Sequence, residues 1–172
     1  MILCPSCGFE NLEGNDSCDQ CQNSLTDLSI PQQRTAVAQG LVNDTIELLK
    51  PRKPLSVAPT DTVGEVLQKM VAEKIGCVMV VEGDEICGIF TEYDALMKVN
   101  TNAHSLANKP ISSVMTAGPV TIEIDHKIAF ALHRMHVGGY RHVPVLNKGK
   151  LVGVTSIRDI LNYLAERIVV PA

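Results

Sequence analysis

The chain has few aromatic side chains and no tryptophan, since only 3% of its 172 residues are Phe, Trp or Tyr. Hydrophobic residues still make up 45% of the chain, so we expect a core built from Val, Ile, Leu, Ala and Met. An excess of basic residues is missing too, because the formal net charge is −4. This charge balance disfavours broad binding to nucleic acid, which requires a basic face that neutralises phosphates.

Long apolar runs are also absent, and none approaches the roughly 18 residues that a membrane-spanning helix needs. The first residues lack the basic and apolar regions of a secretory signal, so we expect a cytoplasmic protein. No nucleophile–base pair, phosphate-binding glycine loop or open metal site stands out in the sequence. We therefore expect a protein that is not an enzyme and that does not enter a membrane.

Cysteines, in contrast, are concentrated near the start, where Cys4, Cys7, Cys18 and Cys21 form two C-x2-C pairs. Each pair brings two sulfurs together at a tight turn, and two pairs make a closed tetrahedral set that suits a structural Zn²⁺ ion. Two disulfides are the alternative, and a reducing compartment disfavours them. So short a segment cannot bury enough surface to fold alone, so metal binding would supply the missing free energy.

Residues 4–21 resemble the short zinc ribbons at the ends of many bacterial and archaeal proteins, although Gln22 stands where a glycine usually follows the second pair. We expect residues 1–25 to form such a ribbon and residues 26–55 to form a linker and a helix. In that segment Gly40 is expected to end or weaken a first helical stretch. A second helical pattern follows over residues 41–49, and Pro51 stops it.

The rest of the chain repeats itself at a distance of 65 residues. The stretch Gly-Ile-Phe-Thr-Glu-Tyr-Asp at 88–94 returns as Gly-Val-Thr-Ser-Ile-Arg-Asp at 153–159. Residues 56–96 align with the second copy without a gap, and core positions such as Leu67 and Leu132, or Met70 and Met135, are identical. This match indicates a duplication. Apolar periodicity and turn residues predict the order β-α-β-β-α in each copy.

Four stretches make the resemblance to a known family specific: 88–94, 112–116 (Ser-Ser-Val-Met-Thr), 139–145 (Gly-Tyr-Arg-His-Val-Pro-Val) and 153–159. With them, the two copies resemble a tandem pair of cystathionine-β-synthase-type (CBS) domains, a Bateman module. The resemblance implies an α/β fold in which repeat 1 (56–99) and repeat 2 (119–172) form a pseudo-two-fold pair, joined by residues 100–118. It also implies a homodimer that binds AMP, ADP, ATP or S-adenosylmethionine and reports the ligand to an unknown protein partner.

The recurring motif has two interpretations. Thr91-x-x-Asp94 and Ser156-x-x-Asp159 match a capping box, which needs no ligand. A helix N-terminus also suits a phosphate, and a carboxylate can accept hydrogen bonds from both hydroxyls of a ribose. The hydroxyl residue can serve both roles, whereas the two roles compete for the Asp. Recurrence at equivalent places, each after a glycine, favours ligand contact in at least one copy.

In this family, a site commonly combines the Asp-bearing helix start of one copy with the second strand of the other. The resemblance thus implies one site formed by Thr91, Asp94, Thr116, Arg141, His142 and Val143. It implies a second site formed by Ser156, Asp159, Gly76, Cys77 and Val78. Arg141 and His142 would face phosphates, so the first site is expected to be better equipped. The second site would favour a less charged adenosine moiety or stay empty, and a surface salt bridge is the alternative role of Arg141.

Two other functions stay open at this point. The CBS pair would have no ligand in the first, and would serve as a dimerisation or interaction scaffold. In the second, the chain would be a transcription-related protein whose zinc ribbon contacts nucleic acid. The absence of Lys, Arg and His from residues 1–25 disfavours direct contact with phosphates.

Overall fold

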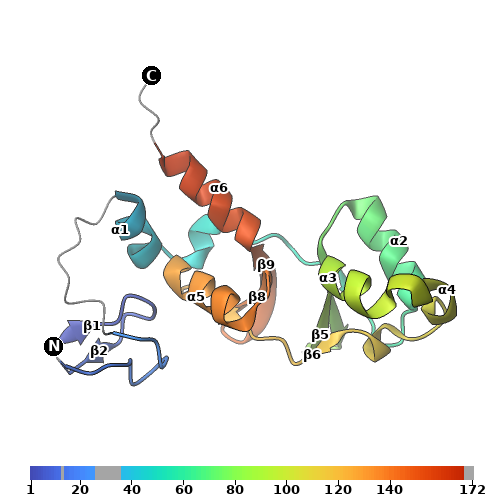
Figure 1. Ribbon diagram of the computed structural model, residues 1–172, viewed down its shortest axis with the longest axis horizontal. Helices are drawn as coiled ribbons and strands as arrows, with labels where there is room; N and C mark the ends of the chain where they lie inside the picture. Colours follow the sequence, from blue (N-terminus) through green and yellow to red (C-terminus); the bar gives the residue numbers. More distant parts are fainter. Residues whose placement is uncertain (13, 26–35, 169–172) are drawn as a thin grey trace. The chain divides into compact units, whose positions relative to one another are not determined.

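A computed structural model describes residues 1–12, 14–25 and 36–168 of the chain (Figure 1). The chain forms two units, which are described separately. Unit 1 comprises residues 1–51, 122–143 and 155–172, and unit 2 comprises residues 52–121 and 144–154. Within the described residues, no helix has both the length and the apolar character needed to cross a bilayer.

The elements up to the end of the first repeat are β1 Ile2–Leu3, β2 Glu10–Asn11, α1 Ala36–Asn43, the 3-10 helix η2 Ile46–Leu49, β3 Ser56–Val57, α2 Val63–Glu73, β4 Cys77–Glu82, β5 Glu85–Thr91, α3 Glu92–Asp94 and the π-helix η3 Ala95–Val99. The rest are η4 Asn100–Asn102, α4 Ala103–Leu106, η5 Ile111–Ser113, β6 Thr116–Ala117, β7 Ile122–Glu123, α5 Ile128–Gly138, β8 His142–Asn147, β9 Lys150–Ser156 and α6 Ile157–Arg167. The predicted order β-α-β-β-α is confirmed in both copies.

The helix after the first strand of each repeat follows from its apolar spacing. In α2, Val63, Val66 and Met70 are buried on one face, and Thr62 with Glu65 forms a capping box at its start. The equivalent positions of α5, which include Ile128 and Met135, are buried as well. Side chains spaced three and four residues apart share one face of a helix, so each helix packs that face into the core.

The sheet of repeat 1 has the order β3-β4-β5-β6. Strands β4 and β5 form an antiparallel hairpin, and its turn includes Gly83 in a left-handed conformation. Strand β6 comes from residues 100–118, which the sequence predicts only as a connection, and it pairs with β5 through Gly88 opposite Ala117. A Cβ atom on Gly88 would lie 2.9 Å from the Thr116 carbonyl oxygen, so the glycine permits this close approach.

Two apolar clusters stabilise unit 2. The larger cluster surrounds Phe90, which is fully buried, and it includes Val63, Val66 and Met70 of α2. The smaller cluster joins Met79 and Ile89 to Val154. Since aliphatic residues provide most of both clusters, the expectation drawn from the scarcity of aromatics is met.

In unit 1, helix α1 packs against α5 and α6 (Figure 1). It continues through Gly40 to Asn43, so the prediction that Gly40 ends a helix is wrong. Gly40 lies directly under the Tyr163 hydroxyl, which a Cβ atom would overlap. The predicted second helix is the end of α1 followed by the short helix η2, whose Ile46 N–H donates to the His126 carbonyl oxygen at 2.9 Å. Residues 26–35 of the predicted linker lie outside the described residues.

Several buried core positions differ between the two repeats, and one of them carries a polar side chain in repeat 2. Thr155 occupies the place that Phe90 has in repeat 1, and its side chain is fully buried. Its hydroxyl has no hydrogen-bond partner in the described part of the chain. An unpaired buried hydroxyl destabilises the folded state, because it loses its hydrogen bonds to water on folding.

We expect Thr155→Val to raise the free energy of unfolding by about 1 kcal/mol, because valine keeps the shape and removes the unpaired hydroxyl. Urea denaturation followed by circular dichroism measures this change. Thr62→Val is the matched control and should lower stability by about 1 kcal/mol, because the Thr62 hydroxyl caps α2. An equal or lower stability of Thr155→Val would show that the hydroxyl is satisfied.

Candidate functional site

The four cysteines of the N-terminal segment converge on one point. All their sulfur atoms lie within 4.8 Å of one another. The closest pairs join the two knuckles, with Cys4 3.6 Å from Cys21 and Cys7 3.6 Å from Cys18. Sulfurs bound tetrahedrally at about 2.3 Å from a zinc ion lie about 3.8 Å apart, whereas a disulfide is about 2.05 Å long. The donor set fits a four-coordinate metal, and all four cysteines are free thiols.

Both knuckles have the same backbone geometry. The residue after each pair, Gly8 or Gln22, has a left-handed conformation with φ of 76° or 59°. Its N–H donates to the carbonyl oxygen of the first cysteine of the pair, at 2.9 Å in the first knuckle and 2.8 Å in the second. Gln22 therefore adopts the turn conformation that glycine usually provides. This left-handed region of φ and ψ is disfavoured for residues that carry a Cβ atom.

Asn11 supports the cluster, and sequence reasoning missed it. Its side chain is buried, and its Nδ2 atom lies 3.6 Å from the Cys18 sulfur. Its Oδ1 atom accepts a hydrogen bond from the Asp19 N–H at 2.9 Å, so Asn11 links strand β2 to the second knuckle. The Ser6 N–H approaches the Cys4 sulfur at 3.4 Å in the same way. Donors of this kind orient metal ligands and stabilise the thiolate charge.

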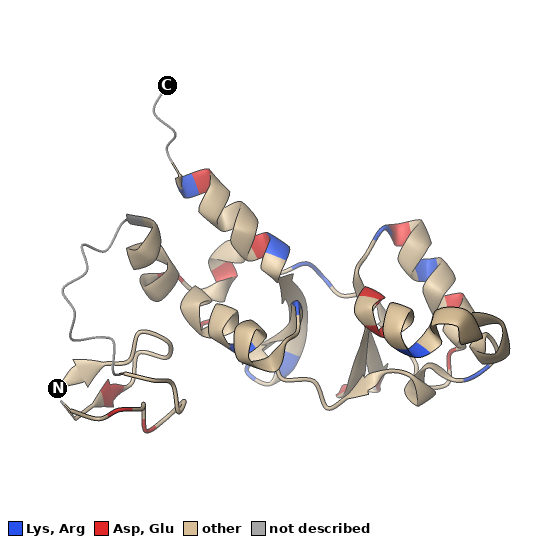
Figure 2. Cartoon of the chain, viewed as in Figure 1, with Lys and Arg blue, Asp and Glu red and all other residues tan. Residues whose placement is uncertain are grey.

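The surroundings of the thiols shift their pKa values in opposite directions. Burial raises the pKa of the Cys18 thiol, but hydrogen bonds from the Cys21 and Gln20 backbone and from Cys7 outweigh it and hold the pKa at about 6. Burial raises the pKa of Cys7 and Cys21. Figure 2 shows acidic residues and no Lys or Arg on the described part of this segment, in agreement with the sequence of residues 1–25.

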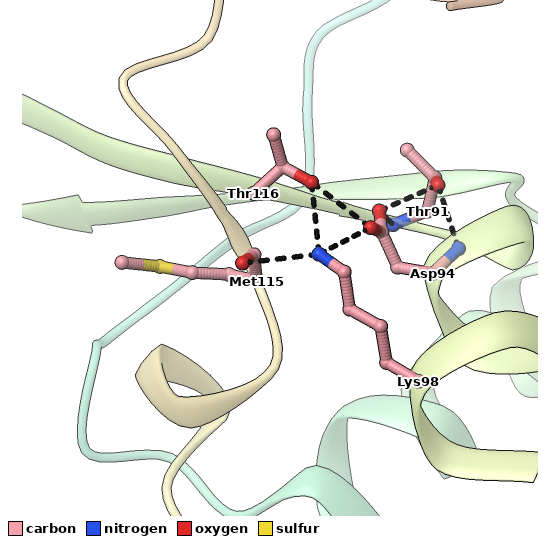
Figure 3. A network of polar contacts seen from close by, with 5 residues as sticks. All are labelled: Thr91, Asp94, Lys98, Met115 and Thr116. Atoms are coloured by element: carbon pink, nitrogen blue, oxygen red, sulfur yellow. Dashed lines mark hydrogen bonds and ion pairs between the residues drawn. The ribbon is translucent and has the colours of Figure 1, made fainter.

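The motif of repeat 1 forms the capping box that its spacing indicates (Figure 3). The Thr91 hydroxyl accepts from the Asp94 N–H at 3.2 Å. Asp94 Oδ2 accepts from the Thr91 N–H at 3.0 Å and from the Thr91 hydroxyl at 2.7 Å. One carboxylate oxygen is thus used entirely for the start of the last helix.

The other oxygen of Asp94 is used as well. Oδ1 accepts from the Thr116 hydroxyl at 2.9 Å and forms an ion pair with Lys98 Nζ at 2.7 Å. Lys98 also donates to the Thr116 hydroxyl at 3.1 Å and to the Met115 carbonyl oxygen at 3.3 Å, as Figure 3 shows. The structure therefore joins Thr91, Asp94 and Thr116 by hydrogen bonds and adds Lys98, whereas their predicted contact with a ligand stays a prediction. The sequence contains a signal for this ion pair, because Asp94 and Lys98 are four residues apart and such residues lie on the same face of a helix.

The motif of repeat 2 has a different environment. Asp159 Oδ2 accepts from the Ser156 N–H and from the Ser156 hydroxyl, each at 2.7 Å. Asp159 is half-buried, and its Oδ1 atom has no hydrogen-bond partner among the residues that the structure describes. The Ile157 N–H donates to the Arg141 carbonyl oxygen at 2.9 Å, so Arg141 lies beside this motif. The Arg141 side chain is exposed.

The same backbone bond occurs in repeat 1, where the Glu92 N–H donates to the Gly76 carbonyl oxygen at 3.0 Å. The residue before the second strand thus lies beside the motif of its own repeat. Arg141, His142 and Val143 belong to unit 1, whereas Thr91 and Asp94 belong to unit 2, so their predicted combination stays a prediction. The same holds for Ser156 and Asp159 with Gly76, Cys77 and Val78.

Comparisons with known proteins agree with the repeat. A family model described as the CBS domain matches residues 47–100 and 111–166. A CBS domain-containing protein from Arabidopsis thaliana is 40% identical over 106 residues, which cover 61% of this chain and 20% of that protein. A protein from Methanopyrus kandleri is 33% identical over 112 residues, which cover 64% of this chain and 57% of that protein. The chain thus spans about a fifth of the Arabidopsis relative.

Two crystal structures share the fold. A CBS-domain containing protein from Agrobacterium tumefaciens has a TM-score of 0.63 and 30% identity, over 69% of this chain and 94% of that one. A CBS domain protein from Pyrobaculum aerophilum, solved in complex with AMP, has a TM-score of 0.60 and 28% identity, over 71% of this chain and 98% of that one.

The network around Asp94 makes a prediction about pH. Burial raises the pKa of Asp94, but hydrogen bonds from Lys98, Thr91 and Thr116 outweigh burial and hold the pKa below its usual value. The stability that this carboxylate contributes is therefore full above the unfolded pKa of about 4 and is lost as pH falls through the folded pKa. We expect the pKa of Asp94 to rise in Lys98→Met, measured by carbon NMR titration of the carboxyl group.

Lys69→Met provides the control, because Lys69 pairs with Asp61 at 3.5 Å on the surface of unit 2. It should leave the titration of Asp94 unchanged. Indistinguishable titration curves in the wild type and Lys98→Met would contradict the ion pair.

Proposed function

This chain belongs to the CBS domain family, and we propose that its CBS pair senses an adenosine nucleotide or a related adenosyl ligand. The AMP complex of the Pyrobaculum relative supports this choice of ligand, because that protein matches over most of its length. In this chain, the observation that carries the proposal is the carboxylate of Asp159. One of its oxygens is open to a ribose hydroxyl while the other caps α6.

Three features of repeat 2 support a ligand there. Helix α6 is 11 residues long, so its peptide dipoles add up to a partial positive charge at its N-terminus, where the first N–H groups can bind an anion. Ser156 holds the Asp159 carboxylate by two hydrogen bonds, so the acceptor is oriented before a ligand arrives. Arg141 lies beside the same motif and can supply a charge-assisted fork of donors to a phosphate. Sequence reasoning favoured Thr91 and Asp94, but the saturated carboxylate of Asp94 favours Ser156 and Asp159.

The proposed mechanism is regulatory and involves no catalysis. A ligand shifts a conformational equilibrium only by its difference in affinity for the two states. An adenosyl ligand held by Asp159 would favour one arrangement of the CBS pair, or of a homodimer formed through it, and a protein partner would read that arrangement. We assign this contact with the partner to the N-terminal ribbon, for which we propose a structural Zn²⁺ ion bound by the four cysteines.

We expect the full chain to bind AMP, ADP, ATP or S-adenosylmethionine at millimolar concentration or below in isothermal titration calorimetry. Asp159→Ala should weaken binding by about 1.5–3 kcal/mol, roughly tenfold to 150-fold, because the ligand loses a charge-assisted hydrogen bond. Asp61→Ala, which removes a half-buried carboxylate elsewhere, should leave the affinity unchanged. Light scattering on the same samples gives the mass and tests the homodimer.

Absence of binding for all four compounds would contradict the ligand-sensing function and leave the dimerisation scaffold as the better account. If Asp159→Ala and the wild type bind the ligand with equal affinity, Asp159 serves only as part of the helix cap. Far-UV circular dichroism of each variant serves as the folding control. A spectrum equal to that of the wild type shows that a loss of binding is not caused by unfolding.

For the ribbon, we expect one zinc ion per chain by elemental analysis of the purified protein. Cys21→Ser should lose the ion, because a tetrahedral site lacks its fourth ligand. Asn11→Ala should keep the ligands and weaken zinc binding by about 10–100-fold, measured by competition with a chelator.

Cys87→Ser is the control, because Cys87 lies outside the cluster, and it should retain the ion. Full zinc occupancy in Cys21→Ser, or no metal in the wild type, would contradict the proposed site.

A further inference from the structure

The two repeats differ at the position four residues after the motif aspartate. Repeat 1 has Lys98 there, and repeat 2 has Tyr163. An i,i+4 pair lies on one face of a helix, so this residue decides what stands beside each carboxylate. The difference bears on how many ligands the CBS pair binds, so the following inference rests on the proposed function.

In repeat 1 the carboxylate has no acceptor position left. An ionised carboxylate offers about four lone-pair sites, two on each oxygen. Oδ2 of Asp94 receives two hydrogen bonds from Thr91, and Oδ1 receives one from Thr116 and the ion pair from Lys98. A ribose hydroxyl therefore cannot donate to Asp94 unless one of these groups leaves.

None of these groups leaves easily. The two Thr91 donors hold the start of the helix, and the Thr116 hydroxyl lies on strand β6, which Gly88 allows to pack closely. Lys98 has 40% of its side chain accessible, but two further acceptors, Met115 O and Thr116 Oγ1, hold its ammonium group. Since the Asp94 side chain is only 8% accessible, removal of Lys98 leaves a buried carboxylate without its cation.

The backbone around Lys98 is also unusual. After Asp94 the chain continues as the π-helix Ala95–Val99, and Asn100 then has φ of 39°. In repeat 2 the corresponding residues belong to the regular helix α6. Single π-turns occur often at functional positions of helices.

No hydrogen bond joins Tyr163 to Asp159 among the residues that the structure describes. Its hydroxyl donates to Asp44 Oδ2 at 2.7 Å, and the Arg167 guanidinium lies 3.7 Å from the centre of its ring. Burial and then the Asp44 carboxylate raise the pKa of Tyr163 to about 12, so the hydroxyl stays a donor at neutral pH. Oδ1 of Asp159 therefore has no internal donor among the described residues.

We propose that Lys98 is an internal counter-ion that occupies the repeat 1 carboxylate and keeps a ligand from binding there. Each chain then binds one adenosyl ligand, through Asp159, instead of two ligands. Lys98 thereby determines the number and place of the ligands, although it contacts none of them. The duplication would give two equivalent ligand sites, one at each motif aspartate. The Lys98 side chain alone would close the site of repeat 1 and leave the site of repeat 2 available.

Calorimetric titration of the full chain with AMP tests this proposal. We expect one site per chain in the wild type and two in Lys98→Met, because methionine fills similar space without donating to Asp94. Lys98→Arg keeps a cation and should bind one AMP. Lys69→Met, the matched surface variant, should also bind one. The double variant Lys98→Met with Asp159→Ala should retain the site at Asp94, whereas Asp159→Ala alone should bind AMP roughly tenfold to 150-fold more weakly.

Lys98→Leu, which also donates no hydrogen bond to Asp94, serves as a second opening variant if the thermal unfolding midpoint of Lys98→Met falls below the titration temperature. Two sites in the wild type, or one site in both opening variants, would overturn the proposal and leave the proposed function intact. Weaker AMP binding in Lys98→Met would overturn it too, since Lys98 would then be a phosphate ligand. No binding by the wild type or by either opening variant would reject both the proposal and the proposed function.

Discussion

A carboxylate has a limited number of acceptor positions, and this limit shapes both halves of the CBS pair. In each repeat, one oxygen of the motif aspartate accepts hydrogen bonds from the N-cap residue of the last helix, Thr91 or Ser156. Only the second oxygen can then distinguish the two copies. In repeat 1 it is filled by Thr116 and Lys98, and in repeat 2 it has no hydrogen-bond partner among the described residues. Cap and ligand contact are therefore compatible roles when one oxygen serves each of them.

In repeat 1, the glycine of the motif has a packing role. A close approach at Gly88 lets strand β6 join the sheet, and this brings Thr116 to the carboxylate. The last helix starts where the strand ends, so its first turn and its carboxylate occupy a defined place at the edge of the sheet. A duplication copies this framework, and substitutions at single positions such as Lys98 and Tyr163 can then change its chemistry without changing the fold.

The N-terminal ribbon depends on a different constraint. Its core consists of Cys4, Cys18 and Leu25 with a few half-buried neighbours, so apolar burial alone stabilises it little. Converging thiols, N–H donors to sulfur and a buried asparagine compensate by forming a site for a cation. Its acidic surface and its lack of basic residues disfavour contact with nucleic acid and suit a protein partner that carries basic residues.

Interactions between residues close in the chain could be predicted from the sequence by itself. The cysteine spacing, the 65-residue repeat, the β-α-β-β-α order and the capping boxes all depend on local backbone geometry, and the residue types reveal them. Only the tertiary structure decided which groups reach each carboxylate. Thr116 is 22 residues from Asp94 and arrives through an unpredicted strand, and Tyr163 turns to Asp44, 119 residues away. Gly40 likewise stays helical because a distant tyrosine packs on it. Such contacts depend on how the elements pack, which no local pattern encodes.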